Sequence, residues 1–375
     1  MISCGEPSGD MYAGALAREL MAQRPGTRVW GLGGEQLRAA GGELVGDYRG
    51  LAVTGLVEAL RVLPTAWRMK QALVERARTD RPDAAVLIDF PDFNFQLAGA
   101  LKALDIPVVY YICPQVWAWR RGRIRTMKSF VSRALVIFPF EESIYRERGI
   151  PVSFVGHPLL DLAVSAEPRG AVLAGAGFVP AAPTVALLPG SRRNELRAIL
   201  PTIAAAVPMI AERMPAVQFL VARAPGLADN LFEPVRELAS RFRVATLLSR
   251  ADDVLAASDV VITASGTATV QTAIHERPMV IVYRVAPLSY TLGRRFVTVD
   301  TYGMANLVAG TRIVPELIQD GFTPERVAAE TLRYFEDAAY AERTRASLRD
   351  VRAKLGSPGA SRRAAEAVLR ECRTP

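Results

Sequence analysis

Two carboxylates follow one apolar run, in the segment Ile-Asp-Phe-Pro-Asp-Phe-Asn at residues 88–94. The run predicts a buried strand over residues 84–89, and a proline holds the turn that follows it. A carboxylate at such a strand end can act as a general base, and Asp89 is the sharper candidate. Asp92 stands near the expected start of a helix, where capping explains it equally well.

Three turns rich in glycine and hydroxyl side chains could bind an anion, at residues 5–10, 188–192 and 264–269. Each links an apolar run to a predicted helix, whose first backbone amides can bind phosphate. Arg192 adds a bidentate donor to the second turn. For the first turn an ordinary tight turn is an equally good explanation, and for the third ordinary helix capping is.

Residues 110–120 hold Trp117 and Trp119, two of the four tryptophans, beside a run of basic residues over 120–128. Aromatic surface next to guanidinium groups suits a ligand with apolar and phosphorylated parts. The alternative is a buried aromatic cluster next to a solvated basic helix.

The 375-residue chain carries 46 basic and 38 acidic residues, for a formal charge of +8. This balance favours an anionic partner, which could be nucleic acid, anionic lipid or a phosphorylated substrate. The sequence has no zinc-finger spacing, ribonucleoprotein motif or basic tail, so we expect no nucleic acid.

The three cysteines share no metal-ligand spacing, and only two histidines, His157 and His275, are present. We therefore expect no metal site and no cofactor. For His157 a buried packing role is favoured over ligand contact, and His275 is interpreted as structural. We expect a cytoplasmic protein, because no run of about 18 apolar residues and no secretion signal is found.

Short β-branched runs alternate with amphipathic stretches, which predicts an α/β protein with parallel strands linked by helices. The length suits two domains. The segment 167–183, rich in Ala, Gly and Pro, is expected to form a hinge between them, and residues after 323 are expected to be helical. Besides a very short opening strand, the predicted strands are 28–31, 84–89, 107–112, 134–138, 153–155, 184–188, 217–222, 244–248, 260–264 and 279–283.

Taken together, the motifs resemble those of the lipid-A-disaccharide synthase family. The resemblance rests on Gly-Glu-Pro-Ser-Gly-Asp, Ile-Asp-Phe-Pro-Asp-Phe-Asn, Pro-Gln-Val-Trp-Ala-Trp-Arg, Phe-Val-Gly-His and Leu-Pro-Gly-Ser-Arg, which occur in that order. It covers residues 2–335. The tryptophan and aspartate motifs are rather specific to this family, whereas the glycine-rich turns are shared with many transferases.

The resemblance implies a GT-B glycosyltransferase, with two Rossmann-like doubly wound domains facing a cleft. Residues 1–165 would form the acceptor and membrane-facing domain, and residues 166–345 the UDP-sugar-binding domain. Residues 346–375 would form a helical segment that packs on the first domain or on a partner subunit.

It further implies inverting transfer from UDP-2,3-diacylglucosamine to 2,3-diacylglucosamine 1-phosphate (lipid X). The products would be a β-1,6-linked disaccharide 1-phosphate and UDP. Asp89 would be the base, and Arg192 would stabilise departing UDP without a metal ion. The residues expected at the donor are Gly190, Ser191, Arg192, Ser265, Gly266, Thr267, Gln271 and Asn306. The residues expected at the acceptor are Ser8, Gly9, Asp10, Asn94, Gln115, Trp117 and Arg120.

Two positions depart from the family pattern. Gln271 stands where the family usually has a glutamate that accepts ribose hydroxyls, and Tyr12 replaces a smaller residue or histidine. Loss of that charge predicts weaker donor binding. Two alternatives stay open. Another UDP-sugar GT-B enzyme would share the turns at 188–192 and 265–267, and Gln271 favours a non-catalytic UDP-sugar-binding protein.

Acylated substrates imply peripheral contact with the cytosolic face of the inner membrane. The segment 56–73, which mixes large apolar residues with Arg61, Arg68 and Lys70, is the candidate surface. Packing on the first domain explains it equally well. A homodimer is a candidate assembly.

Overall fold

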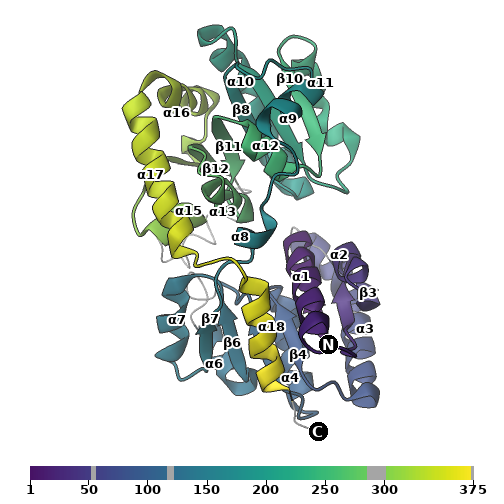
Figure 1. Cartoon of the computed structure of the whole chain (residues 1–375). Helices are drawn as coiled ribbons and strands as arrows, with labels where there is room; N and C mark the ends of the chain where they lie inside the picture. The colour runs from purple at the N-terminus through teal and green to yellow at the C-terminus, as the bar shows by residue number, and fades with distance from the viewer. Residues whose placement is uncertain (52–55, 116–121, 285–300, 373–375) are drawn as a thin grey trace. The chain divides into compact units, whose positions relative to one another are not determined.

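The computed structural model describes the chain except residues 52–55, 116–121, 285–300 and 373–375 and the side chains of residues 56–61. The chain forms two compact units (Figure 1). Unit 1 contains Met1–Asp161 and Leu355–Pro375, and unit 2 contains Leu162–Lys354. Unit 1 therefore holds both ends of the chain.

Unit 1 is built on a parallel sheet of seven strands in the order β3-β2-β1-β4-β5-β6-β7. The order reverses at β1, and open α/β sheets bind ligands beyond the carboxyl ends of the strands at such a point. The strands are β1 (Ile2–Cys4), β2 (Trp30–Gly33), β3 (Glu43–Asp47), β4 (Ala85–Ile88), β5 (Val108–Tyr111), β6 (Arg133–Val136) and β7 (Val152–Phe154).

Helices connect these strands, as the crossovers of a parallel sheet require. Every residue of β4 and β5 is buried, which explains why both read as unbroken apolar runs. The helices are α1 (Pro7–Gln23), α2 (Glu35–Ala39), α3 (Leu56–Asp80), α4 (Pro91–Lys102), α6 (Gly122–Phe130), α7 (Pro139–Arg146), α8 (Leu159–Leu162), which ends at the unit boundary, and α18 (Ala360–Glu371).

Unit 2 is built on a second parallel sheet, in the order β10-β9-β8-β11-β12-β13, which reverses at β8. Its strands are β8 (Thr184–Leu188), β9 (Gln218–Arg223), β10 (Val244–Leu248), β11 (Val260–Ala264), β12 (Met279–Tyr283) and β13 (Glu316–Ile318). Its helices are α9 (Arg169–Gly175), α10 (Arg193–Arg213), α11 (Glu233–Ala239), α12 (Ala251–Ala257), α13 (Thr267–Ile274), α15 (Met304–Ala309), α16 (Pro324–Glu336) and α17 (Ala338–Lys354).

Helix α10 shows how the sequence directs packing in unit 2. Leu196, Ile199, Leu200, Ile203 and Val207 follow helical spacing, and each is at most 1% exposed. They form one apolar stripe that joins the core of the second sheet.

The ten predicted strands are all present, with ends shifted by at most two residues, so the α/β prediction is confirmed. The sequence missed β3 and β13. Both lie at sheet edges and are only half buried, so they lack an apolar run. Helix α1 begins at Pro7, inside the first glycine-rich turn.

The expected hinge at 167–183 is instead folded into unit 2. Its helix α9 packs on α12, and Arg169 pairs with both carboxylate oxygens of Asp259 at 3.0 Å. The chain crosses between the units after Asp161 and after Lys354, where boundaries near 165 and 345 were expected. The expected second boundary lies inside α17.

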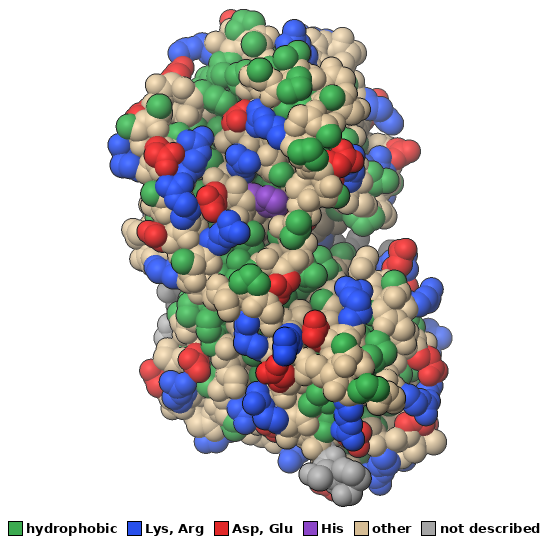
Figure 2. All heavy atoms as spheres, viewed as in Figure 1, with side chains coloured by type: hydrophobic (Ala, Val, Ile, Leu, Met, Phe, Trp, Pro, Cys, Tyr) green, Lys and Arg blue, Asp and Glu red, His purple; other side chains and the backbone are tan. Residues whose placement is uncertain are grey.

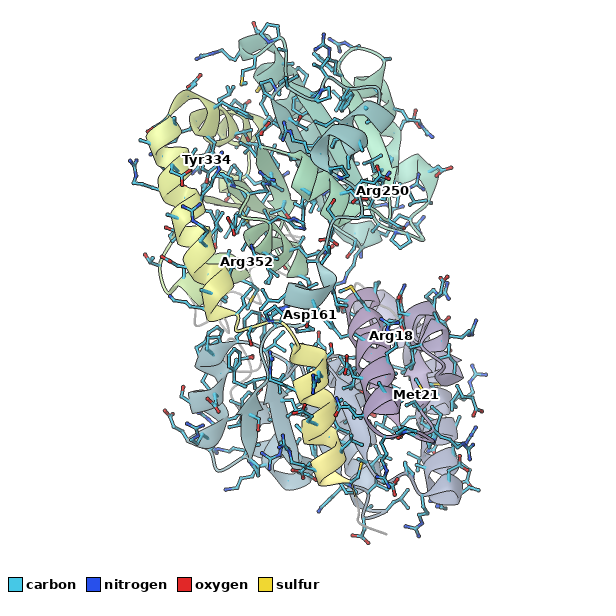
Figure 3. The ribbon with its side chains drawn as sticks, in the orientation of Figure 1. Arg18, Met21, Asp161, Arg250, Tyr334 and Arg352 are labelled. Atoms are coloured by element: carbon cyan, nitrogen blue, oxygen red, sulfur yellow. The ribbon has the colours of Figure 1, made fainter. Side chains whose placement is uncertain are left out.

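Helix α18 returns to unit 1 and packs along α1 (Figure 1). Asp161, labelled beside the start of α18 in Figure 3, accepts hydrogen bonds from the amides of Gly359 at 2.8 Å and Ala360 at 3.1 Å. Arg363 donates to the carbonyl of Val155 at 2.8 Å. Unit 1 is thus completed by the last segment of the chain.

Within the described parts of the chain, no helix is both long and apolar enough to cross a membrane.

We expect Asp161→Ala to loosen α18, because the substitution removes the acceptor for the first amides of the helix. The cost is about 1 kcal/mol or somewhat more. Amide hydrogen exchange over residues 360–371 should speed up accordingly. Asp161→Asn, which keeps one acceptor oxygen, should show a smaller change. Asp350→Ala, at an exposed residue of α17, should show none. Unchanged exchange in Asp161→Ala would contradict this role.

Candidate active site

Two turns of unit 1 are locked together at the point where the sheet order reverses. The Ser3 hydroxyl donates to the Asn94 side-chain oxygen at 2.8 Å, and the Asn94 amide donates to the Asp89 carbonyl at 2.8 Å. The Phe90 ring lies against Gly5, where a Cβ atom would come within 2.1 Å of the ring. The turn after β1 is therefore shaped to fit the turn after β4.

Asp89 and Phe90 both adopt left-handed backbone conformations, with φ of 44° and 50°. Such a conformation costs about 1–3 kcal/mol for a residue other than glycine, and such strain is concentrated at functional sites. Besides Asn94, the hydroxyl of buried Tyr110 donates to the Asp89 carbonyl at 2.8 Å. These bonds hold half-buried Asp89 in place. Sequence reasoning missed Tyr110, although it lies near the end of the neighbouring strand.

Asp10 is only 3% exposed, and its carboxylate caps helix α2. It accepts hydrogen bonds from the amides of Gly34 at 2.7 Å, Gln36 at 2.9 Å and Leu37 at 3.2 Å. Asp10 thereby fixes the turn after β2. The structure gives this residue and buried Asn94 a positioning role, and their contact with an acceptor stays a prediction.

The other residues expected at the acceptor differ in exposure. Ser8 is half-buried and Gly9 is buried, and both lie in the first turn of α1. Gln115 is exposed after β5. Trp117 and Arg120 lie outside the described residues.

In unit 2, the turn after β8 presents exposed Ser191 and Arg192 at the start of α10. Gly190 precedes them with φ of 118°, a conformation that favours glycine. The Glu195 carboxylate folds back onto the turn and pairs with the Arg192 guanidinium at 2.9 Å.

The turn after β11 has a different arrangement. Gly266 adopts φ 149° and ψ −156°, a region open essentially to glycine alone. Gly266 and Thr267 are exposed, and within the described residues no side chain caps the start of α13. The Ser265 hydroxyl instead donates to the Tyr302 carbonyl at 2.9 Å. The amino end of α13 therefore faces outward and is suited to an anion.

Glu316 of edge strand β13 anchors the segment that Ser265 contacts. Its carboxylate accepts from the amides of Tyr302 and Gly303 at 2.9 Å and from the Asn306 side chain at 2.8 Å. Asn306 is 1% exposed, and its oxygen also accepts from the Val314 amide at 3.1 Å. Asn306 thus has a positioning role as well. Glu316 was missed because β13 was missed.

Tyr283, at the end of β12, connects the two turns of unit 2. Its ring stacks on that of Tyr302, with centroids 6.4 Å apart. Burial raises the pKa of Tyr283, and the nearby Glu195 carboxylate raises it further. Arg192, Ser265 and Tyr283 therefore lie at the carboxyl ends of β8, β11 and β12, at the same end of the second sheet.

A recess of about 550 Å³ lies at the opposite end of the strands of this sheet, next to the amino ends of β9 and β10. Glu212, Arg241 and Phe242 are among its lining residues. Because ligands of open α/β sheets bind beyond the carboxyl ends, we place no site there.

On the face drawn in Figure 2, basic and acidic side chains are interspersed over both units. Within the described residues, no three His, Cys, Asp or Glu are grouped to hold a metal ion.

Known proteins resemble this chain in sequence and in fold. A family described as lipid-A-disaccharide synthetase matches residues 1–370. The chain belongs to the lipid-A-disaccharide synthase family. The lipid-A-disaccharide synthase of Geobacter metallireducens is 43% identical over 369 residues, covering 98% of this chain and 96% of the relative. That of Myxococcus xanthus is 42% identical over 374 residues, with the same coverage of both chains.

Solved structures show the fold that this family member shares with distant proteins. A UDP-GlcNAc 2-epimerase from Neisseria meningitidis, bound to UDP-GlcNAc, has a TM-score of 0.71 at 13% identity, covering 98% of each chain. A glycotransferase of kitacinnamycin has a TM-score of 0.64 at 19% identity, covering 100% of this chain and 98% of that one. The GT-B prediction is confirmed. Family membership makes the chain an enzyme of the glycosyltransferase class.

Gln271, interpreted from the sequence as a departure from a family glutamate, faces helix α12. Its side-chain amide lies 3.4 Å from a carboxylate oxygen of Asp252, which also lies 3.0 Å from His275 Nε2. A glutamate at position 271 would set two negative charges side by side, which is unfavourable. Glutamine instead donates a hydrogen bond to Asp252, so the residue at this position suits the charge of its neighbour. A contact of Gln271 with ribose stays a prediction.

His157 is 2% exposed, and its Nδ1 accepts a hydrogen bond from the Leu159 amide at 3.2 Å. Its ring packs edge-on against buried Tyr12, with centroids 6.3 Å apart, and near Phe138. Tyr12 therefore fills space beside a buried histidine. Burial lowers the pKa of His157 to about 3.

The lowered pKa of His157 predicts acid sensitivity. Between its ordinary value of 6.5 and about 3, the unfolded chain binds a proton at His157 that the folded chain does not. The free energy of unfolding should therefore fall as the pH falls, by at most about 1.4 kcal/mol per pH unit from this residue. In urea unfolding between pH 7 and pH 4.5, His157→Asn should show a shallower decline than wild type. Identical slopes would contradict the assignment, and His275→Asn is the control.

Proposed function

We propose that this enzyme transfers 2,3-diacylglucosamine from UDP-2,3-diacylglucosamine to the 6-hydroxyl of lipid X with inversion. It would form the β-1,6-linked disaccharide 1-phosphate of lipid A biosynthesis and release UDP. Membership of the lipid-A-disaccharide synthase family, over residues 1–370, carries this proposal. The turns at the carboxyl ends of the strands in both units support it.

The donor diphosphate is proposed to bind unit 2, at the turns after β8 and β11. Ser191 and Arg192 offer amides and a guanidinium. Gly266 and Thr267 are exposed at the start of α13, which no described side chain caps. Amides at a helix N-terminus and an arginine stabilise the charge that develops on departing UDP. Buried Asn306 would act by holding the neighbouring segment.

Asp89 is proposed as the base in unit 1. It would accept the proton of the acceptor 6-hydroxyl as that oxygen bonds to the anomeric carbon. The bond from that carbon to the diphosphate oxygen would break, and its electron pair would leave with UDP. Support comes from the strained, doubly hydrogen-bonded backbone of Asp89, since a fixed carboxylate loses little entropy in reaction.

An assay with both acylated substrates in detergent, measuring UDP and disaccharide by mass, tests the reaction. Wild type should form both products in equal amounts. Asp89→Asn should lower kcat by about 100-fold or more while UDP affinity stays unchanged. Arg192→Ala should weaken UDP binding and slow turnover, because it removes a charged donor.

Three outcomes would contradict parts of the proposal. UDP release without disaccharide would point to another acceptor or to hydrolysis. UDP binding without turnover would favour a binding protein. Near-full turnover in Asp89→Asn would remove Asp89 as the base. Asp92→Asn, at an exposed residue of α4, is the matched control for that substitution.

We also propose that α3 contacts the cytosolic face of the inner membrane. Leu63 and Trp67 lie one helical turn apart and are 55% and 59% exposed. Exposed Arg68 and half-buried Lys70 follow them. Apolar side chains that can enter lipid, beside cations that attract anionic headgroups, are typical of peripheral membrane helices.

The double variant Leu63→Ser and Trp67→Ser should reduce co-sedimentation with anionic phospholipid vesicles by about tenfold or more, because two large apolar side chains no longer enter the lipid. Charge reversal at Arg68 and Lys70 should also reduce it, more strongly at low salt. Leu248→Ser, at a residue of unit 2 that is 57% exposed, is the matched control. Vesicle binding that is unchanged in both variants would exclude this surface.

A further inference from the structure

The Glu195 carboxylate occupies the anion-binding groups of the turn after β8. One of its oxygens accepts hydrogen bonds from the amides of Ser191 at 3.2 Å and Arg192 at 3.3 Å. The other accepts from the Arg192 guanidinium at 2.9 Å. Two amides and one arginine thus already surround a negative group that belongs to the chain itself.

The backbone of the turn leaves room for this arrangement. Gly190 approaches Glu195 so closely that a Cβ atom at Gly190 would lie 2.8 Å from the carboxylate oxygen and 2.9 Å from Glu195 Cβ. The Glu195 side chain is 21% exposed, and that of Arg192 is 45% exposed. The carboxylate therefore lies at the surface, in a place that a ligand can reach.

A phosphate group needs the same donors that Glu195 uses. Two anions cannot share them without repulsion, because like charges close together at a protein surface disfavour each other. The start of α13 differs, since within the described residues no side chain caps it. Among the described residues, the turn after β8 already holds a carboxylate and the turn after β11 does not.

We propose that Glu195 is an internal competitor of the donor diphosphate: its carboxylate holds the turn after β8 in the ligand-free enzyme and gives up these donors when UDP-sugar binds. This role rests on the proposed placement of the diphosphate. It makes Glu195 a specificity-determining residue, because a small anion must displace the carboxylate without the further contacts that a nucleoside and a sugar supply.

The test is calorimetric titration of UDP and of pyrophosphate into Glu195→Gln. Glutamine is isosteric and keeps an acceptor oxygen for the amides, so the turn retains its cap while the negative charge is lost. Pyrophosphate should bind about five- to tenfold more tightly than to wild type, and UDP by a smaller factor. The difference should shrink at 1 M salt, where the Debye length is about 3 Å.

Glu212→Gln provides the matched control. Glu212 is an exposed residue near the other end of the same helix, so its substitution removes the same charge about 25 Å away. It should leave both affinities unchanged. Glu195→Ala gives a second measurement that does not depend on the glutamine cap, with folding checked by circular dichroism.

Arg192→Ala separates failure of this inference from failure of the donor site. If Arg192→Ala weakens UDP binding but Glu195→Gln and Glu195→Ala bind pyrophosphate no more tightly than wild type, Glu195 is a helix cap only and the inference is overturned. If Arg192→Ala leaves UDP affinity unchanged, the diphosphate does not bind this turn, and the placement under the proposed function is wrong.

Discussion

Parallel pairing at the centre of each sheet is the constraint on which the candidate site depends. β1 pairs with β4, and β8 pairs with β11, in both cases with the chain running in the same direction. Neighbouring parallel strands have their carboxyl ends at the same end of the sheet, so turns that are far apart in sequence are brought together there. Ser3 and Asn94 can bond only for this reason. The helices that parallel crossovers require cover both faces, and the strands at the reversal are buried.

Buried polar side chains then fix the shape of these turns. Asp10, Asn94 and Asn306 were expected to bind ligand, yet each is at most 3% exposed and is hydrogen-bonded to backbone groups. Since an unsatisfied buried polar group is costly, such bonds leave little freedom for the turn to move. Pre-organised turns of this kind stabilise developing charge without rearranging.

At the proposed ligand groups, the two units differ in which residues carry the strained backbone. In unit 1, Asp89, Phe90 and Ile112 are among the left-handed residues that carry side chains, and they follow the neighbouring strands β4 and β5. In unit 2 the positive-φ residues at the two proposed diphosphate turns are Gly190 and Gly266, while Ser249 and Gln319, which carry side chains, are left-handed after β10 and β13. Where a side chain is proposed to act on the ligand, the strained backbone sets the direction of that side chain. Where the backbone amide is proposed to act, glycine lets the ligand approach closely.

The sequence by itself determined the fold class, ten strands and the family, because buried parallel strands are continuous apolar runs and because the motifs are local. It also marked the strand ends where Asp89, Arg192 and Gly266 lie. Only the tertiary structure decided which of these polar residues are exposed and which are buried supports. Asp10 caps a helix that starts 25 residues later, Tyr110 holds the Asp89 backbone, and Glu316 comes from an edge strand without an apolar signal. Their partners are distant in sequence, and no local pattern specifies contacts that form only when the sheet assembles.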